Sequence, residues 1–284
     1  MSTEQASAIR FSCQTYAWQM SGTTYTGQLP RFVEVASSAG FAGLEAEPFM
    51  LGDYSDIDRA HGVIDPSDLE LSSVAFVADW RSARETDAER DAADHFIRFV
   101  SSFPGALLLL VQAPGPDRED LGERQQNAIS SIRAIGERAA DAGVRTSFHA
   151  NSPAGSVFRT RDDYGVLLDG LEGGVVGFTP DAGHLAKGGM DPLEVIRTYR
   201  SRVDHIHLKD YSASAGWQLT GHGSVDFPGI VGYLRDTGYD GWVVVEDESA
   251  DAVSDPDAVT RAAGEYVRTV LQPLVGAATD NREA

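Results

Sequence analysis

The chain has 284 residues, of which 42% are hydrophobic and 23% are charged, so it can build one large globular domain with a sizeable core. Its 43 acidic and 23 basic residues give a formal net charge of −20, which disfavours nucleic acids and anionic membranes as partners. The single cysteine, Cys13, excludes an intramolecular disulfide and predicts a reducing, cytoplasmic compartment. No signal sequence is recognised at the start, and the longest apolar run, 106–111, is too short to span a bilayer.

Short apolar runs rich in β-branched residues alternate with longer amphipathic stretches along the whole chain. The predicted strands are 9–16, 43–47, 71–78, 106–111, 145–149, 175–179, 203–208 and 241–246. Eight units in 284 residues give a spacing of about 35 residues, which is the size of one βα unit. We therefore predict an α/β fold, a single (β/α)₈ TIM barrel over 9–274, with flexible tails at 1–8 and 275–284. A doubly wound open sheet is the alternative, but no GxGxxG follows an early strand.

Several helix ends can be read directly from the sequence. Thr86 and Glu89 have the spacing of a capping box, and the Asp-Pro pairs at 191–192 and 255–256 place an N-cap acid before a first-turn proline. Gly143 predicts the end of the helix that precedes the fifth strand. The acidic stretch 247–257 is predicted to be a loop.

Polar side chains gather at the C-terminal ends of the predicted strands, which is the catalytic rim of a TIM barrel. They are Glu45 and Glu47 at the end of the second strand, His149 at the end of the fifth, Asp181 and His184 after the sixth, His205 and His207 near the end of the seventh, and Glu246 at the end of the eighth. Four of the seven histidines of the chain lie at this rim, so we interpret it as a functional site.

Imidazole and carboxylate groups from neighbouring strands can hold a divalent cation. Asp181, His207 and Glu246 come from successive strands, and His149 supplies a fourth ligand from the strand before them. In strand geometry His205 and His207 share one face, so either can be the ligand. We expect one Mn²⁺, with Mg²⁺, Co²⁺, Zn²⁺ and Fe²⁺ as alternatives.

Each of these residues also has a structural interpretation. His149 alone is as consistent with a hydrogen-bonded structural histidine as with a ligand. Asp181 and His184 can simply cap the loop after Pro180. Glu246 follows three valines, and a buried carboxylate there requires a partner, so we favour function for it.

Substrate contacts are predicted at the ends of the first and second strands and beside the metal ligands. The candidates are Tyr16, Trp18, Glu45, Glu47 and His205. Glu45 or Glu47 can instead pair with an arginine. Tyr16, Trp18 and also Trp80 can stack on a sugar ring, but for any one of them a place in the core is the stronger interpretation.

Four segments make the chain resemble the sugar phosphate isomerase/epimerase family, whose members have a xylose isomerase-like TIM barrel. They are GFAGLEAEP at 40–48, FTPDAGHLAKGGMDP at 178–192, RVDHIHLKDY at 202–211 and the segment at 221–248 that ends in GWVVVEDE. The resemblance implies metal ligands at Asp181, His207 and Glu246, and a substrate-contacting histidine at His184. The AP endonucleases share this fold, but this chain lacks their additional metal-binding histidines and a basic surface.

The fifth strand departs from the pattern of the ketose 3-epimerases in this family. They carry a glutamate where this chain has His149, in the segment RTSFHAN, which argues against a two-glutamate proton transfer. A histidine there can ligate the metal or act as a base. The segment is closer to inosose dehydratases, and other relatives cleave C-glycosides by elimination from a 3-keto sugar.

We therefore expect a metal-dependent enzyme that abstracts a proton next to a carbonyl and forms an enediolate from a sugar or keto-sugar. The lead hypothesis is an isomerase or epimerase, the alternative is a lyase, and a non-catalytic sugar-binding barrel ranks third. His149, Glu246, His184 and Lys209 are the predicted catalytic residues. Asp210 can pair with Lys209, and the segment GHGSVDF after the seventh strand is a weak phosphate candidate. A homo-oligomer or a partner subunit fits the resemblance, but no segment identifies an interface.

Overall fold

The computed structural model describes residues 9–276 and has eight parallel strands arranged as a barrel. The barrel strands are β1 (Arg10–Gln14), β2 (Gly43–Ala46), β3 (Glu70–Ala78), β4 (Leu107–Gln112), β5 (Arg145–His149), β6 (Val176–Thr179), β7 (His205–Leu208) and β10 (Trp242–Val245). Hydrogen bonding follows the order β6-β5-β4-β3-β2-β1-β10-β7, so the first and last strands are neighbours. Parallel bridges from Phe178 to Val203 and from Asp181 to His207 join β6 to β7 and bring the barrel close to complete closure.

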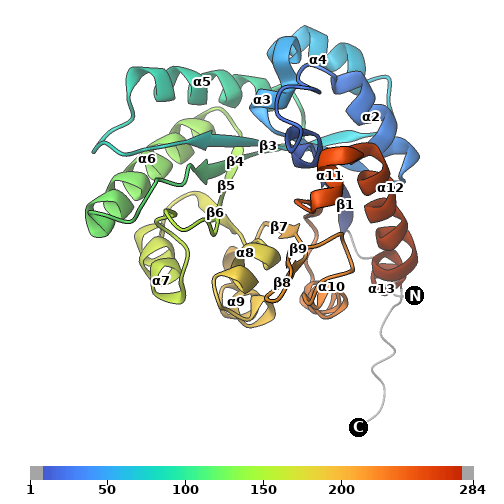
Figure 1. The fold of residues 1–284 in the computed structure, drawn as a ribbon. Helices are drawn as coiled ribbons and strands as arrows, with labels where there is room; N and C mark the ends of the chain where they lie inside the picture. The colour runs from blue at the N-terminus through green and yellow to red at the C-terminus, as the bar shows by residue number, and fades with distance from the viewer. Residues whose placement is uncertain (1–8, 277–284) are drawn as a thin grey trace, which may run out of the picture.

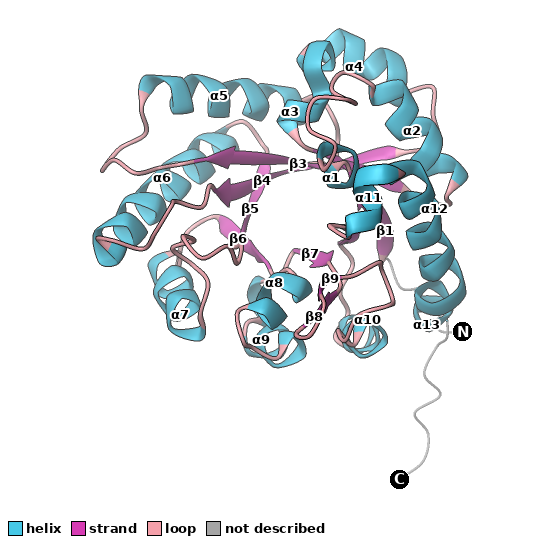
Figure 2. Ribbon diagram, viewed as in Figure 1, coloured by secondary structure: helices cyan, strands magenta, loops and turns pink. Residues whose placement is uncertain are grey.

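Helices form an outer ring around these strands (Figures 1 and 2). The helices are α1 (Tyr16–Gln19), α2 (Leu29–Ser38), α3 (Pro48–Leu51), α4 (Ile57–Ile64), α5 (Asp87–Ser101), α6 (Leu121–Asp141), α7 (Arg161–Gly170), α8 (Ala182–Lys187), α9 (Pro192–Thr198), α10 (Phe227–Asp236), α11 (Ala250–Ser254), α12 (Pro256–Tyr266) and α13 (Gln272–Gly276). Shorter turns are η1 (Gly52–Ser55), η2 (Arg200–Arg202) and the π-helical η3 (Val267–Leu271). The late helix α12 packs beside the early helix α2, which closes the outer ring as well (Figure 1).

Strand β4 shows why the apolar runs of this sequence become barrel strands. Leu107 to Leu110 are fully buried, because one face of a barrel strand packs against helices and the other faces the barrel interior. Glycine is needed at position 43 of β2, since a Cβ there would lie 2.8 Å from the Trp242 ring. No helix within residues 9–276 is long and apolar enough to cross a membrane.

The predicted barrel and the predicted helix ends are confirmed. Thr86 and Glu89 form a capping box at the start of α5. Asp191 and Asp255 cap α9 and α12, each followed by a proline in the first turn. Gly143 follows α6 with φ +74°, a left-handed conformation that glycine adopts without steric cost.

Two local predictions are corrected by the structure, and one element was missed. The acidic stretch 247–257 is not a continuous loop, because Ala250–Ser254 form α11 and α12 starts at Pro256. The first strand ends at Gln14, and α1 begins at Tyr16. A two-stranded hairpin of β8 (Tyr211–Ser212) and β9 (Gly216–Trp217) follows β7 and was not predicted.

The predicted domain boundary at 274 falls inside α13, whose buried Val275 packs with the core. The rest of the tails predicted at 1–8 and 275–284, namely 1–8 and 277–284, lies outside the described residues.

Candidate metal centre

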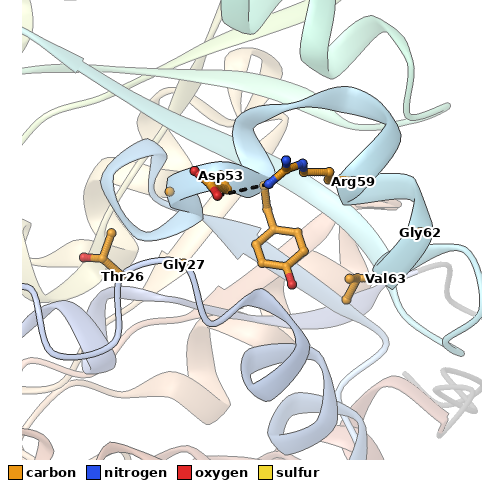
Figure 3. A pocket seen from close by; sticks show the side chains of 8 residues that line it. Thr26, Gly27, Asp53, Arg59, Gly62 and Val63 are labelled. Atoms are coloured by element: carbon orange, nitrogen blue, oxygen red, sulfur yellow. Dashed lines mark hydrogen bonds and ion pairs between the residues drawn. The ribbon is translucent and has the colours of Figure 1, made fainter.

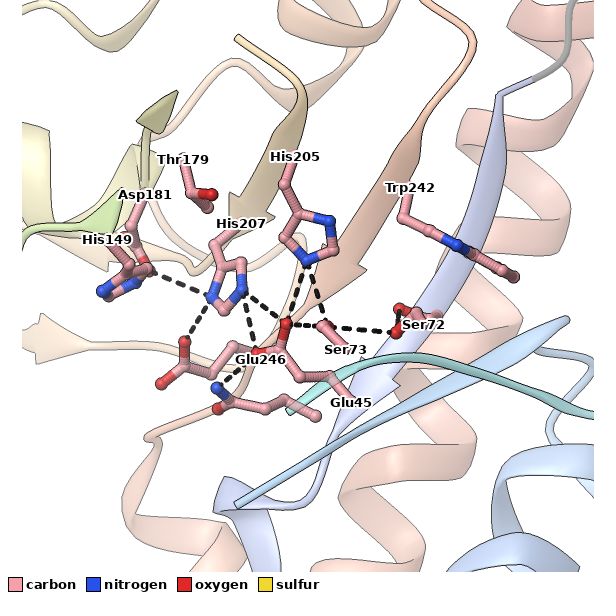
Figure 4. Close-up of polar contacts among 12 residues, drawn as sticks. Glu45, Ser72, Ser73, His149, Thr179, Asp181, His205, His207, Trp242 and Glu246 are labelled. Atoms are coloured by element: carbon pink, nitrogen blue, oxygen red, sulfur yellow. Dashed lines mark hydrogen bonds and ion pairs between the residues drawn. The ribbon is translucent and has the colours of Figure 1, made fainter. Parts of the chain in front are cut away.

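Four buried side chains from four neighbouring strands meet at the C-terminal rim of the barrel. They are His149 at the end of β5, Asp181 after β6, His207 on β7 and Glu246 after β10 (Figure 4). Each offers one ligand atom, and the four atoms all lie within 4.8 Å of one another. The arrangement therefore provides two imidazole nitrogens and two carboxylate oxygens, a donor set that suits a divalent cation.

A helix cap and a β-bridge position Asp181 and His207. Asp181 is the N-cap of α8, and its Oδ1 accepts a hydrogen bond from the His184 backbone N–H at 2.6 Å. That bond holds the carboxylate while Oδ2 faces His149 Nε2 at 3.4 Å. The bridge between Asp181 and His207 keeps the two chain segments in register. The structural capping role considered for Asp181 is thus real, and it leaves one carboxylate oxygen directed into the cluster.

The acid–base state of these side chains follows from burial and close charges. Burial alone would lower the pKa of His207, but the carboxylates of Glu45 and Glu246 raise it to about 10. Burial alone would raise the pKa of Glu246, but Lys209 and His207 lower it. The pKa of Asp181 is lowered as well, because His184 and Lys209 outweigh its burial. Both carboxylates are therefore ionised and available to a cation.

The nitrogen that His149 presents to the cluster is Nε2, 3.4 Å from Asp181 Oδ2, while its buried Nδ1 has no hydrogen-bond partner among the described residues. Two imidazoles and two ionised carboxylates form a donor set that fits a divalent cation. His149, Asp181, His207 and Glu246 are therefore the residues that would hold the ion.

Lys209 and His184 form a hydrogen-bonded pair at the edge of the cluster. Lys209 is almost fully buried, and its Nζ lies 2.5 Å from Glu246 Oε1, 2.7 Å from Glu248 Oε1 and 3.1 Å from His184 Nε2. Burial alone would lower the pKa of Lys209, but the carboxylates of Glu246 and Glu248 raise it well above its usual range. Burial and the adjacent Lys209 charge lower the pKa of His184 well below its usual value. The structure thus places a neutral imidazole next to a protonated amine.

Glu45 and His205, predicted to contact substrate, lie below the metal cluster inside the barrel. Both are fully buried, and His205 Nε2 lies 2.9 Å from Glu45 Oε2 (Figure 4). Their hydrogen bonds are made to other side chains of the barrel interior, and contact with substrate stays a prediction for both residues. The structure also distinguishes the two histidines of β7, since His207 joins the cluster and His205 lies beneath it.

The other three predicted substrate residues divide between the rim and the core. Tyr16 is half-buried, with its ring 5.6 Å from Lys209 Nζ, so it lies beside the catalytic candidates. Trp18 is fully buried, packs 4.7 Å from the Phe32 ring and donates Nε1–H to Asp257, so it belongs to the core instead. Glu47 is buried, and its burial together with Glu246 and Glu45 raises its pKa well above the usual range.

Two residues near the pair of Lys209 and His184 were not predicted from sequence. Trp217 lies on the β8–β9 hairpin, with its ring 5.2 Å from the His184 ring and 5.2 Å from Lys209 Nζ. Glu248 reaches Lys209 from the segment predicted to be a plain acidic loop. Neither hairpin residues nor a loop carboxylate have a periodic pattern, so no sequence signal singles them out.

Asp210 does not pair with Lys209. It is buried and accepts hydrogen bonds from the backbone N–H groups of Gly221, Gly223 and Val225. These amides belong to the glycine-containing segment considered for phosphate. Because a carboxylate of the chain itself already occupies them, the structure argues against phosphate binding by this segment.

A pocket of about 670 Å³ lies elsewhere, lined by Thr26, Gly27, Asp53, Arg59 and Val63 among others (Figure 3). Its charged groups are the exposed pair Arg59 and Asp53, 3.0 Å apart. It contains no member of the metal cluster and no buried titratable side chain, so its size alone does not identify it as the reaction site.

Comparison with known proteins gives a consistent result. A family model described as xylose isomerase-like TIM barrel matches residues 33–270. An inosose dehydratase of Clostridium perfringens (strain 13 / Type A) is 22% identical, over 92% of this chain and 97% of that protein. Among solved structures, an IolI protein with a bound zinc atom has a TM-score of 0.75 at 12% identity, covering 93% of this chain and 99% of its own. An L-ribulose 3-epimerase has a TM-score of 0.73 at 16% identity, covering 96% and 100%.

Proposed function

Starting from the fact that this chain belongs to the xylose isomerase-like TIM barrel family, we propose that it is a divalent-metal-dependent lyase that removes water from a keto-sugar or keto-cyclitol. The observation that carries this choice is the hydrogen-bonded pair of Lys209 and His184 beside a fifth-strand histidine. The pair supplies one acid and one base on the same side of the cluster, whereas transfer between opposite faces needs groups on both sides.

The metal would be held by His149, Asp181, His207 and Glu246. A bound divalent cation stabilises negative charge that develops on a carbonyl oxygen and its neighbouring hydroxyl. We keep Mn²⁺ as the proposed ion, with Zn²⁺ and the other divalent cations as alternatives. The zinc in the IolI structure shows what that protein binds and supports a divalent ion here.

The residues of the chain divide the elimination between them. His184 is neutral and accepts the proton from the carbon next to the carbonyl, leaving an electron pair that forms the new C=C bond. The β carbon–oxygen bond then breaks, and Lys209 donates a proton to the leaving hydroxyl, which departs as water. The 3.1 Å contact between the two side chains lets the proton return from His184 to Lys209 for the next turnover.

Two aromatic rings lie next to Lys209. Trp217 on β9 and Tyr16 at the start of α1 have ring centroids 5.2 and 5.6 Å from its Nζ. Aromatic faces suit the C–H faces of a sugar or cyclitol ring and exclude water from the proton-transfer groups. The backbone N–H groups of the glycine-containing segment already bind Asp210, which argues against a phosphate group on the substrate. A neutral polyhydroxylated ring is consistent with that.

The second candidate is an isomerase or epimerase, and Glu47 is the observation that favours it. Its raised pKa keeps this buried carboxyl protonated, so it can donate a proton to a carbon or oxygen from the β2 side. The first proton abstraction would be the same, and only the site of reprotonation would differ. Cytoplasmic location and self-association stay predictions from the sequence.

The test is to incubate the Mn²⁺-loaded protein in D₂O with a panel of inososes and 3-keto sugars. Elimination would give an unsaturated product, with ultraviolet absorbance and a mass lower by one water. Deuterium incorporation or a changed sugar configuration without water loss would support the isomerase or epimerase instead. Neither outcome across the panel, in a protein shown to hold metal, would overturn both. The Lys209→Met variant, with the metal ligands intact, is the matched control.

A further inference from the structure

Beneath the metal cluster, Glu45 makes contacts that neither the family resemblance nor the proposed reaction uses. We propose that Glu45 is a positioning residue that fixes His207 as an Nδ1 ligand by accepting a hydrogen bond from its Nε2–H. This inference rests on the proposed metal centre, and it assigns to Glu45 a role that involves no contact with substrate.

Four hydrogen-bond donors surround the Glu45 carboxylate. Gln14 Nε2 donates to Oε1 at 2.7 Å. Oε2 faces Ser73 Oγ, His205 Nε2 at 2.9 Å and His207 Nε2 at 3.2 Å, and His207 Nε2 also lies 3.0 Å from Oε1. An ionised carboxylate can only accept hydrogen bonds, and the four donors come from three strands, β1, β3 and β7.

This arrangement determines which nitrogen of His207 faces the metal cluster. Nε2 points down to Glu45, while Nδ1 lies 2.9 Å from Glu246 Oε2 and 3.9 Å from Asp181 Oδ2 (Figure 4). A histidine ligand needs one unprotonated nitrogen for the metal and usually donates its other N–H to an acceptor. A carboxylate that can only accept therefore selects the tautomer with the proton on Nε2 and leaves Nδ1 free for the ion.

The side chains that hold Glu45 in place are themselves hydrogen-bonded to other buried side chains. Ser73 also lies 3.3 Å from His205 Nε2 and contacts Ser72, which donates to Ser12 Oγ at 3.0 Å. All of these side chains are fully buried inside the barrel. The acceptor for His207 thus has little freedom to move, as a positioning group requires.

A second metal ion between Glu45, His205 and His207 is the competing interpretation, since these three also lie within 4.8 Å of one another. The distances of 2.9 and 3.0 Å between the carboxylate and the two ring nitrogens are hydrogen-bond lengths. Two ligands on one tetrahedral ion with bonds of about 2.1 Å would lie roughly 3.4 Å apart. Gln14 and Ser73 also donate to Glu45, so both carboxylate oxygens already have hydrogen-bond donors in place of an ion.

The test compares Zn²⁺ affinity in the wild type, Glu45→Gln and Asp204→Asn, measured by competition with a chelator. Asp204 is the matched control, because it is also a largely buried acid, bound to Ser147 Oγ at 2.7 Å, but it contacts no member of the metal cluster. We expect Glu45→Gln to bind Zn²⁺ about 10- to 100-fold more weakly and Asp204→Asn to bind it unchanged. Equal affinity in all three proteins would overturn the inference.

Two readouts separate positioning from a purely structural role. In the Zn²⁺-loaded wild type, ¹⁵N NMR of labelled histidines should show His207 with a protonated Nε2, which requires no variant to fold. A metal-bound Nε2 of His207 would overturn the inference. The second readout is the number of ions per chain: two ions in the wild type, with one of them lost in His205→Asn, would overturn it as well. A wild type that binds no ion at all would instead overturn the proposed function, which keeps the two failures apart.

Discussion

The carboxylates at the rim of the barrel and the carboxylate beneath them face the same histidine, but their surroundings differ. Glu246 and Asp181 each keep an oxygen directed at other charged groups of the cluster, including Lys209 at 2.5 and 3.8 Å. Glu45 is surrounded by four hydrogen-bond donors. We expect the first two carboxylates to act as metal ligands and the carboxylate enclosed by donors to act as a support for a ligand. Burial alone does not distinguish the two, since all three side chains are buried.

The largest expected effect is at the rim. Glu246→Gln removes an anionic ligand while keeping the size of the side chain, so we expect loss of metal binding and a drop in kcat/KM of more than about 100-fold. At a metal concentration of about 100 times Kd, the wild type should gain about 2.7 kcal/mol of unfolding free energy, and the variant should gain none. Calorimetric melting with and without Zn²⁺ measures this. Full metal-linked stabilisation in the variant would remove Glu246 from the ligand set.

The Lys209→Met variant separates metal binding at the rim from proton transfer. The amine is paired with Glu246 and Glu248 and its positive charge opposes a nearby cation, so its removal should leave metal affinity equal or higher. Turnover should fall by about 10²- to 10⁴-fold, because a proton donor is lost. Metal titration and steady-state kinetics on the same preparation check both effects. Weaker metal binding together with normal turnover would contradict the assignment.

Asp204 extends the comparison to a fourth carboxyl. It lies directly before β7 and accepts a hydrogen bond from Ser147 Oγ. Its burial raises its pKa to about 6 from 3.8. Because the pKa of Asp204 is higher in the folded than in the unfolded chain, the folded state is stabilised when this carboxyl is protonated. The stabilisation is fully present below about pH 4 and is lost as the pH rises through about 6. Relative to Asp204→Asn, the wild type should lose at most about 3 kcal/mol between pH 4 and pH 7. Urea unfolding across this pH range tests the difference, and parallel curves would refute it.

The smallest effect is expected at Trp217, one of the two aromatic residues next to Lys209. Trp217→Ala should raise KM by about 2- to 10-fold, because a stacked ring contributes about 0.5–1.5 kcal/mol. The metal affinity should not change. Asp53→Asn, in the separate pocket of Figure 3, is the control and should change neither KM nor stability by more than about 0.5 kcal/mol. A KM effect in Asp53→Asn would move the substrate site to that pocket.

The sequence alone determined the barrel and the position of its rim. The eight apolar runs recur at the spacing of one βα unit, and parallel strands in a barrel bring their C-terminal ends together. His149, Asp181, His207 and Glu246 each lie at such an end, so their convergence followed from topology without knowledge of side-chain contacts. Local caps such as Thr86 with Glu89 were equally predictable, because they depend on residues three positions apart.

Only the tertiary structure decided the depth and partners of the polar groups. His205 and His207 share a strand face, and a separation of about 6.6 Å along that strand puts one at the rim and the other beneath it. The donors that fill Glu45 come from β1, β3 and β7, and the hairpin that carries Trp217 has no periodic pattern. Contacts between residues far apart in the chain depend on packing, which the alternation of polar and apolar residues does not specify.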